Sequence, residues 1–385
     1  MTAQPALVVA GISVRAMAES ARAAGWDVVA LDLFGDRDTL RASRRWLPIG
    51  DAATLAIDPM ALAAALRSAA QSPGVIGWVA GSGFEADPAL LEAGGSGLPL
   101  LGMPAGAVAA VRDARHFFAT LDRLGLAHPP VAFSRPELAH GWLAKRQGGS
   151  GGWHIRRAAR HGPATADTYY QRFQGGEPMS ALLLADGVRA RVVALNRLLV
   201  HPLHGQPMVY SGAVGPVEDT ALLSCIEQAL ARLVPAFELR GLASLDFIAA
   251  QGVPWLLEIN ARPSASMQLH DGAVEGGLMQ AHVRAHAGAL PRTLRRIGGV
   301  RGHRIVFASS PCDADGGLID ALDRDAHCHD VPAAAGRFAG GQPVCSVSAE
   351  GADAGAVERL LRQRCAGVRS GLLGRSHRHA LRRIQ

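Results

Sequence analysis

The 385-residue chain has very little lysine and asparagine: one lysine, Lys145, and two asparagines, Asn196 and Asn260. Its net charge of +6 is therefore carried by arginine. A compositional bias this strong replaces lysine and asparagine wherever arginine or aspartate can serve. The three survivors are candidates for positions with a specific chemical requirement, because arginine does not supply a compact ammonium and aspartate does not supply a neutral amide. Chance survival is the alternative for each of them.

Other absences exclude classes of protein. The five cysteines are scattered and form no CxxC pair, which is typical of reduced thiols in the cytoplasm. No apolar run is long enough to span a bilayer, and no basic segment precedes the first strand-like run, so we predict neither a membrane span nor a signal peptide. No stripe alternates aromatic and basic residues, which argues against nucleic acid. The basic residues 375–383 are interpreted as a solvated tail. A homodimer is left open.

The first hundred residues alternate strand and helix patterns. Residues 6–10, 26–33 and 75–80 are predicted strands and residues 15–24 a helix, which together indicate a parallel α/β unit. The turn after the first strand lacks the second glycine of the dinucleotide fingerprint, which disfavours a nicotinamide oxidoreductase. Loops at strand ends bind ligands in such folds, so we predict substrate contacts from two of them. The predicted residues are Ser13, Arg15, Ser82, Phe84 and Glu85.

The most glycine-rich loop of the chain, residues 148–152, follows a predicted strand that carries Lys145. A single helix is predicted upstream, over residues 108–124. Glycines let backbone N–H groups approach phosphate closely, and a lysine beside them supplies a compact positive charge. The loop does not match the Walker pattern, so a P-loop is not predicted. Its combination with the only lysine favours a phosphate site over a flexible turn.

The stretch LEINARP, residues 257–263, places polar side chains at every second position of an apolar strand. Because strand side chains alternate between faces, Glu258, Asn260 and Arg262 are expected on one face. The residues expected in the core are Leu257, Ile259 and Ala261. The pattern indicates a strand with one buried face and one face that carries chemistry.

The preceding strand carries Asp246. If the turn between the strands is centred on Gly252, Asp246 pairs opposite Glu258, and directly opposed residues share a face. Two adjacent carboxylates repel unless a cation lies between them, and hard oxygen ligands suit Mg²⁺ or Mn²⁺. Arg262, just beyond, can clamp phosphate oxygens with its planar fork. The alternative is an ordinary exposed hairpin face.

These features resemble the ATP-grasp superfamily, in their order along the chain. The series is Lys145 with its GGSGG loop, residues 170–173 leading to Gly176-Glu177, then Asp246 and LEINARP. The resemblance covers roughly residues 1–290 and more loosely the rest. It implies an α/β protein with a Rossmann-like domain before a two-lobed ATP-grasp fold and a small β-rich C-terminal segment. The implied divisions are 1–105, 106–185 and 186–290 for the Rossmann-like domain, small lobe and large lobe, and 291–385 for the C-terminal segment with its basic tail.

The resemblance also implies roles for individual residues. Lys145 would contact the α- and β-phosphates of ATP, and Gly148, Gly149, Ser150, Gly151 and Gly152 would cover the triphosphate. The backbone of Gln171, Arg172 and Phe173 would meet adenine, and Glu177 would hold the ribose. Asp246, Glu258 and Asn260 would ligate Mg²⁺ (or Mn²⁺), and Arg262 would stabilise the transferred phosphoryl group. Arg172 departs from the family, which often has an acidic residue in this segment.

Three further predictions concern residues outside those motifs. Arg191 is a candidate for reaching the ATP site or the acyl phosphate. Ser264 and Ser266 are candidates for the substrate pocket. The run from His327 through Cys328 to His329 resembles a metal cluster, but adjacent residues rarely converge on one ion without a second cluster. Cys345 is expected in the core.

The implied function is an ATP- and Mg²⁺-dependent ligase that activates a small carboxylate as an acyl phosphate and joins it to an amine or a thiol. The C-terminal segment resembles that of predicted carboligases related to biotin carboxylase. More loosely, the layout is similar to ATP-grasp proteins found with one-carbon carrier (methanofuran and tetrahydromethanopterin) biosynthesis. The alternatives are a carboligase that uses bicarbonate and a nucleotide-binding protein without turnover.

Overall fold

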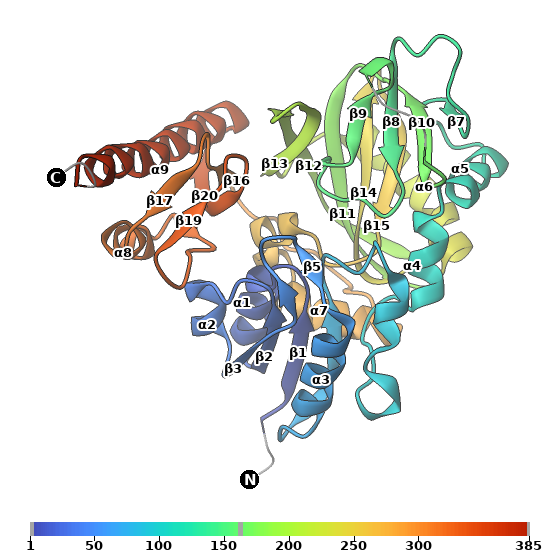
Figure 1. Ribbon diagram of the computed structural model, residues 1–385. Helices are drawn as coiled ribbons and strands as arrows, with labels where there is room; N and C mark the ends of the chain where they lie inside the picture. Colours follow the sequence, from blue (N-terminus) through green and yellow to red (C-terminus); the bar gives the residue numbers. More distant parts are fainter. Residues whose placement is uncertain (1–3, 161–164, 383–385) are drawn as a thin grey trace.

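The computed structural model describes residues 4–160 and 165–382, and their side chains except those of residues 96 and 374–382 (Figure 1). The basic side chains of the predicted tail, 375–383, therefore lie outside the described part. The N-terminal region, blue in Figure 1, lies below two others: a central region in green and yellow, and a C-terminal region in orange and red. Each contains its own sheet strands and covering helices.

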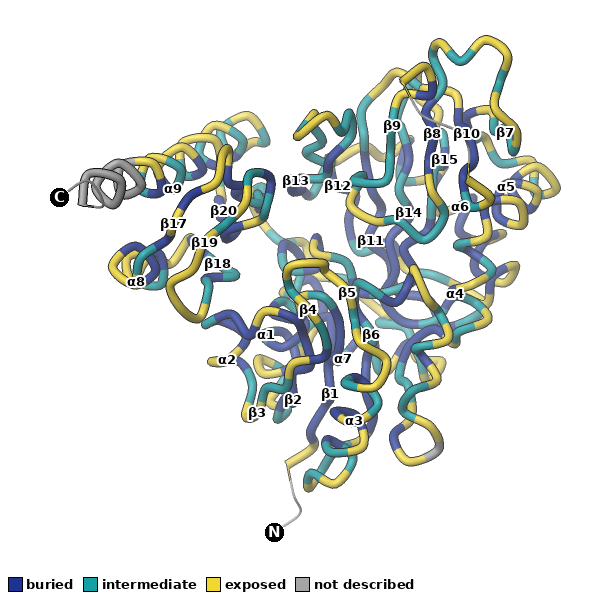
Figure 2. Tube along the Cα trace, in the orientation of Figure 1, coloured by how far each residue is buried: buried dark blue, intermediate teal, exposed yellow. Residues whose placement is uncertain are grey.

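The N-terminal region is built on a four-stranded parallel sheet in the order β3-β2-β1-β6. Its strands are β1 (Ala6–Ala10), β2 (Asp27–Asp32), β3 (Arg45–Pro48) and β6 (Val75–Ala80), with the short pair β4 (Gly50–Asp51) and β5 (Ala56–Ile57). Its helices are α1 (Arg15–Ala23), α2 (Arg37–Ala42), α3 (Pro59–Ala70), η1 (Pro88–Glu92) and η2 (Gly95–Gly97). Every β1 residue is fully buried, because alternate side chains enter cores on opposite faces of the sheet (Figure 2). The predicted Rossmann-like α/β unit is confirmed.

A four-stranded antiparallel sheet, β7-β10-β8-β9, opens the central region. Its elements are α4 (Ala105–Arg112), α5 (Ala114–Arg123), β7 (Val131–Ala132), β8 (Trp142–Arg146), β9 (Ile155–Arg157), η3 (Ala158–Arg160) and β10 (Thr168–Arg172). The single helix predicted over residues 108–124 is wrong. Asp113 leaves the helical conformation and its carboxylate accepts from the N–H of His116 at 3.0 Å, which caps a second helix.

An eight-stranded antiparallel sheet dominates the rest, in the order β15-β14-β11-β12-β13-β16-β20-β18. Its first five strands in the chain are β11 (Glu177–Asp186), β12 (Ala190–Leu203), β13 (Gln206–Gly215), β14 (Arg240–Ala250) and β15 (Val253–Asn260). Helix α6 (Thr220–Phe237) packs on one face of this sheet, and α7 (Gly277–His286) on the other, after η4 (Ala265–Leu269) and η5 (Asp271–Ala273). Helix α6 is long and apolar enough to cross a membrane, but its apolar residues form part of the core.

The C-terminal region adds strands to the same large sheet. These are β16 (Val300–Phe307), β18 (Cys328–His329) and β20 (Pro343–Gly351), beside the small pair β17 (Cys312–Ala314) and β19 (Gly336–Phe338). The predicted β-rich segment also contains two helices, α8 (Gly316–Arg324) and α9 (Ala354–Arg382). Cys345 is buried in their core as predicted, and the five cysteines are free thiols. The four-part division of the chain remains a prediction, although strand pairing places β11 in the larger sheet.

Candidate functional site

The hairpin of β14 and β15 carries a β-bulge that decides which side chains meet. A two-residue turn, Gln251-Gly252, pairs Phe247 with Leu256, and this register would set Asp246 against Leu257. The register shifts between Asp246 and Phe247, so Asp246 lies opposite Glu258. The predicted pair is confirmed, but it depends on the bulge and not on a turn centred on Gly252.

The bulge also changes which residues enter the core. Leu256 is buried in the core beneath α6, together with Ile259 and Ala261. Leu257, predicted to lie there, is only half-buried, because the extra residue of the bulge removes it from the alternation. The prediction of the core face of β15 is therefore correct for Ile259 and Ala261 and wrong for Leu257.

A row of polar residues crosses four strands of the large sheet on the same face. Asp246 pairs with Glu258 on one side and Ser180 on the other, and Ser180 pairs with Asn196. Directly opposed residues share a face, so all four point to one side of the sheet. The Asn196 Oδ1 atom accepts from His270 Nε2 at 2.6 Å, whereas its Nδ2 atom is buried without a partner. The row ends in a donor that is available to a ligand.

The two opposed carboxylates have the electrostatics of a cation site. Burial and the charge of Glu258 raise the pKa of Asp246, although Asn260 Nδ2 donates to Asp246 Oδ2 at 3.0 Å. Burial also raises the pKa of Glu258, but the positive charges of Arg112 and Lys145 outweigh it and bring the pKa below its usual value. No group of three His, Cys, Asp or Glu side chains that could hold a metal occurs in the described residues. The residues fit a divalent cation with the Asn260 amide as third ligand.

Lys145 reaches the same site from the smaller sheet. It is buried, and its Nζ atom donates to Gln171 Oε1 at 2.7 Å. Burial lowers the pKa of Lys145, while the nearby charges of Glu258 and Asp246 act in the opposite direction. The Gln171 Nε2 atom is buried without a partner. The predicted lysine and one predicted adenine-segment residue therefore lie together and retain unused hydrogen-bonding capacity.

The glycine-rich loop, 148–152, extends from the smaller sheet onto the larger one. The carbonyl of Gly151 accepts from the N–H of Tyr210 at 3.0 Å on β13. Gly152 has a φ of +78°, and a Cβ there would lie 1.7 Å from the carbonyl oxygen of Met208. Only glycine permits this approach. The loop therefore bridges the two sheets beside the carboxylate pair.

Arg112, the last residue of α4, was not predicted and joins the loop to the carboxylates. Its Nη1 atom lies 3.4 Å from Glu258 Oε2, and its Nη2 atom donates to the carbonyl of Gly149. Its Nε atom is buried without a partner. No sequence signal distinguishes Arg112 from the other arginines, since the partners lie 37 and 146 positions away.

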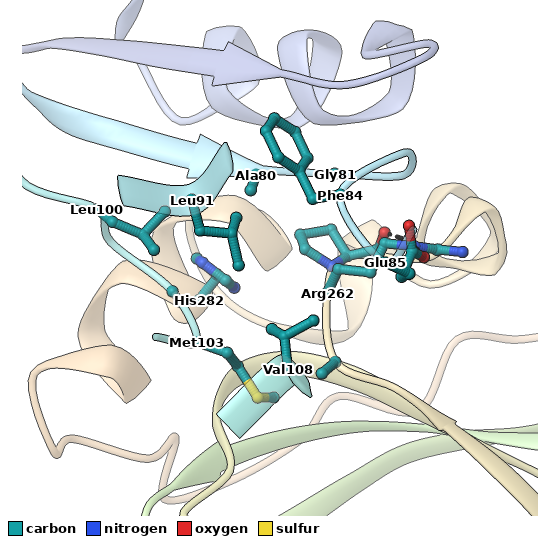
Figure 3. Close-up of a pocket in the computed structure, with 13 residues that line it drawn as sticks. Ala80, Gly81, Phe84, Glu85, Leu91, Leu100, Met103, Val108, Arg262 and His282 are labelled. Atoms are coloured by element: carbon teal, nitrogen blue, oxygen red, sulfur yellow. Dashed lines mark hydrogen bonds and ion pairs between the residues drawn. The ribbon is translucent and has the colours of Figure 1, made fainter. Parts of the chain in front are cut away.

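Arg262 contacts a residue that was predicted independently for the substrate pocket. Its Nε atom donates to Glu85 Oε1, and Glu85 Oε2 accepts from the N–H of Gly83 at 2.8 Å. Burial raises the pKa of Glu85, but the charge of Arg262 outweighs it and the net pKa is lowered. Figure 3 shows this pair at the edge of a small, largely apolar cavity between the N-terminal and central regions. Side chains around the cavity include Phe84, Leu91, Leu100, Met103, Val108 and His282.

The remaining predicted substrate residues differ in how accessible they are. Ser13 is exposed and Ser82 half-buried, whereas Phe84 is buried with its ring centroid 5.6 Å from that of Trp78. Ser264 and Ser266 follow Arg262 and their hydroxyls lie 3.0 Å apart. Of these, Phe84 lines the same cavity as Arg262, and the two serines follow Arg262 in the chain.

Arg15 does not offer a free charge to a substrate. Its guanidinium donates to Asp330, Glu19 and Gln268, at 2.7, 2.8 and 2.8 Å. These partners come from the C-terminal region, its own helix and η4. The residue is 4% exposed and joins the N-terminal region to the C-terminal region, while its predicted contact with a substrate remains a prediction.

Arg191 is also placed away from the site. Its side chain is exposed and donates to the carbonyl of Arg292 at 3.4 Å. On β12 it pairs with Leu184, whereas the site-facing Asn196 pairs with Ser180 at the other end of the strand pair. The role of Arg191 toward ATP or the acyl phosphate remains a prediction, because an apolar strand does not reveal which of its ends borders a site.

The predicted adenine and ribose segment forms a strand end with mixed exposure. The Arg172 guanidinium lies over the ring of Trp142 at 5.9 Å, and Phe173 is half exposed. Glu177 forms an ion pair with Arg197, which also contacts Glu358 of α9. The roles of these residues toward a nucleotide remain predictions.

Two further residues missed in the sequence border the polar row. The Tyr210 Oη and His303 Nε2 atoms lie 2.9 Å apart. His303 pairs with Ala213, which places it on the same face as Asn196, and burial lowers its pKa to about 4. In contrast, His329 contacts Ser348 at 2.9 Å, and no metal-binding group of described residues includes it or Cys328.

The family comparison covers the region that holds most of this site. Residues 111–266 match the model of the ATP-grasp domain, while no curated protein matches the chain in sequence. Many solved structures match nearly the whole chain. One is an L-amino acid ligase from Bacillus licheniformis, with 15% identity, 94% of this chain and 97% of that chain covered, and a TM-score of 0.69. Another is an N5-carboxyaminoimidazole synthetase from Staphylococcus aureus complexed with ADP, with 14% identity, coverages of 94% and 98%, and a TM-score of 0.68. A third is the biotin carboxylase domain of 2-oxoglutarate carboxylase from Hydrogenobacter thermophilus with MgADP, ADP and bicarbonate, with 11% identity, coverages of 90% and 86%, and a TM-score of 0.68. At these identities the likeness shows the fold.

Proposed function

We propose that the protein is an ATP- and Mg²⁺-dependent ligase that joins a carboxylate to an amine, since residues 111–266 match the model of the ATP-grasp domain. The observation that carries the proposal is the half-buried pair Asp246 and Glu258, which are opposed in register and lie near the charge of Lys145. A protein that only sensed nucleotide would not need two carboxylates with their charges forced together. The named structural neighbours, an amino acid ligase and a carboxyaminoimidazole synthetase, support carbon–nitrogen bond formation.

The residues that would hold the nucleotide and metal are those that the structure gathers at the two sheets. Asp246, Glu258 and Asn260 would ligate the cation, which neutralises charge on the phosphates when bound. Lys145 and the loop 148–152 would bind the phosphates. The unpartnered Nε2 of Gln171 is available to the base. Roles at the adenine and ribose for Arg172, Phe173 and Glu177 complete the proposal.

The reaction has two steps, formation of an acyl phosphate and its attack by the amine. A carboxylate oxygen attacks the γ-phosphorus of ATP, the bond to the β–γ bridging oxygen breaks, and ADP leaves with an acyl phosphate remaining. The amine nitrogen then attacks the acyl carbon, phosphate leaves with the C–O bond electrons, and the nitrogen loses a proton. Lys145 and Arg262 stabilise the charge that moves onto oxygen during these steps, because they are held in place before the reaction begins.

The substrate is proposed to lie beside Arg262, at the cavity of Figure 3. Glu85 holds the guanidinium from the N-terminal region, so substrate contacts come from both regions of the chain. The wall of the cavity beside Arg262 is largely apolar, and Ser264 and Ser266 supply hydroxyls next in the chain.

The test is ADP release with Mg·ATP over a panel of carboxylates, with hydroxylamine as a general acceptor. The panel contains the twenty common L-amino acids and bicarbonate, the anion present in one of the matching structures. Hydroxamate formation identifies an acyl phosphate. The proposal fails if Mg·ATP neither binds, measured by thermal shift, nor is hydrolysed with any carboxylate.

A finer proposal places the enzyme in one-carbon carrier biosynthesis, which rests on the resemblance of the layout alone. It is tested by offering furan- and pterin-based amines as acceptors in the same assay. A cytoplasmic location and a homodimer remain predictions of the same kind.

A further inference from the structure

Arg112 occupies a position between the carboxylate pair and the glycine-rich loop. One arm of its guanidinium contacts Glu258 at 3.4 Å, and the other donates to the carbonyl of Gly149. The Arg112 side chain is 11% exposed, whereas the Glu258 side chain is 36% exposed and can be reached from solvent. Arg112 therefore supplies positive charge at a carboxylate that the proposed function assigns to a divalent metal.

A metal ion and Arg112 cannot use Glu258 independently. A cation at the carboxylate pair would lie close to the guanidinium, and two positive charges at that distance repel each other. Lys145 adds a third charge nearby. Metal binding at Asp246 and Glu258 therefore requires that Arg112 move away or that its charge be neutralised.

The guanidinium has an alternative partner available in a nucleotide. Its Nε atom is buried and has no partner, and an arginine fork matches the geometry of phosphate oxygens. The other guanidinium nitrogen, Nη2, donates to the carbonyl of Gly149, which belongs to the segment proposed to cover the triphosphate. A bound phosphate would thus offer Arg112 negative charge when it leaves Glu258.

We propose that Arg112 is a positioning residue that competes with divalent metal for Glu258, so that the metal loads together with the nucleotide and not before it. The inference rests on the proposed metal site and goes beyond the proposed function. Glu258 is neutralised by Arg112 until a phosphate draws the guanidinium away. The same movement releases Gly149, which couples metal entry to the glycine-rich loop.

The test measures metal binding without nucleotide. Mn²⁺ is titrated into the full-length protein and free Mn²⁺ is followed by electron paramagnetic resonance. We expect weak binding to the wild type and at least tenfold tighter binding to Arg112→Ala, because the competing charge is gone. Arg112→Gln is measured in parallel, in case the alanine variant folds poorly by circular dichroism.

Two controls assign the effect to this contact. Arg115→Ala removes a nearby arginine whose guanidinium lies 4.2 Å from the Phe133 ring centre, and it should leave Mn²⁺ affinity unchanged. Adding Glu258→Gln to Arg112→Ala should abolish the gained binding. The inference is overturned if both Arg112 variants bind Mn²⁺ no tighter than wild type, or if the gain survives loss of Glu258.

A second readout concerns the loop. Hydrogen exchange of the amides in residues 148–152 should be faster in Arg112→Ala than in Arg115→Ala, and unchanged exchange would contradict the coupling to Gly149. Failure of the proposed function is recognised separately. If wild type does not bind Mg·ADP, the ligase proposal fails, whereas the Mn²⁺ comparison reports on Arg112 alone.

Discussion

Two arginines at junctions between regions, Arg15 and Arg262, show how differently the same side chain is used. Arg15 donates to Asp330, Glu19 and Gln268 and is almost completely buried. Arg262 has one carboxylate partner, Glu85, and lies beside a cavity. A buried cation whose donors are used by several regions holds those regions together. A cation with one carboxylate partner beside a cavity is the arrangement expected where a ligand completes the site.

The largest effect on folding is expected at Arg15, whose guanidinium donates to three side chains. Arg15→Ala should lower the free energy of unfolding by about 3 kcal/mol, because the Asp330 carboxylate then loses the guanidinium that it pairs with. Chemical denaturation measures it. Arg41→Ala is the control, since that arginine is 55% exposed and its pair with Asp323 should contribute under about 1 kcal/mol. Equal losses of stability in the two variants would show that the Arg15 contacts hold the regions together no more strongly than an exposed ion pair does.

The largest effect on activity is expected at the carboxylate pair. Glu258→Gln should reduce kcat by at least about 100-fold while leaving the melting temperature close to that of wild type, because it removes a metal ligand and its charge but keeps the shape. The assay is Mg·ATP-dependent ADP release with thermal unfolding alongside. Normal turnover in this variant would show that the metal lies elsewhere.

A smaller effect is expected at the only lysine. Lys145→Ala should weaken Mg·ADP binding about 10- to 100-fold, since a phosphate loses its charge-assisted partner. Isothermal titration calorimetry measures the affinity. Arg191→Ala, at the exposed position away from the site, should bind Mg·ADP as wild type does. A loss in Arg191→Ala as large as that in Lys145→Ala would support the sequence prediction for Arg191.

The smallest expected effect is a pH dependence at the junction beside the cavity. His282 Nε2 donates to the carbonyl of Leu101 at 2.6 Å and Nδ1 accepts from the N–H of Leu242 at 2.8 Å, and burial lowers its pKa to about 4. The unfolded state then binds more protons between about pH 6.5 and 4, so stability is lost as pH falls through this window.

From pH 7 to 5 the loss attributable to His282 should be up to about 2 kcal/mol. Denaturation of wild type and His282→Gln at the two pH values measures it, and the variant should lose less stability on acidification. An identical pH dependence in both proteins would show that other groups are responsible.

The hairpin and the smaller sheet illustrate what could be predicted from the sequence. Alternation in LEINARP identified Glu258 and Asn260, and the rarity of lysine identified Lys145, because both signals are local. Neither signal located the bulge that sets Asp246 against Glu258. The amino-acid sequence is the same with or without a one-residue shift in strand pairing, so it does not show the shift. Arg112 and the partner of Arg15 were inaccessible for another reason. Asp330 is 315 positions from Arg15, and pairings at such separation depend on how regions pack.

The sequence by itself indicated the parallel α/β unit at the N-terminus, the polar face of the strand that carries Glu258 and Asn260, and the glycine-rich loop after Lys145. These follow from periodicity and from the properties of single residues, which act over a few positions. Only the tertiary structure decided which arginines are anchors and which face a site. That choice depends on whether folding places a carboxylate from a distant segment against the guanidinium. The interaction energy of two such charges exists only in the folded chain.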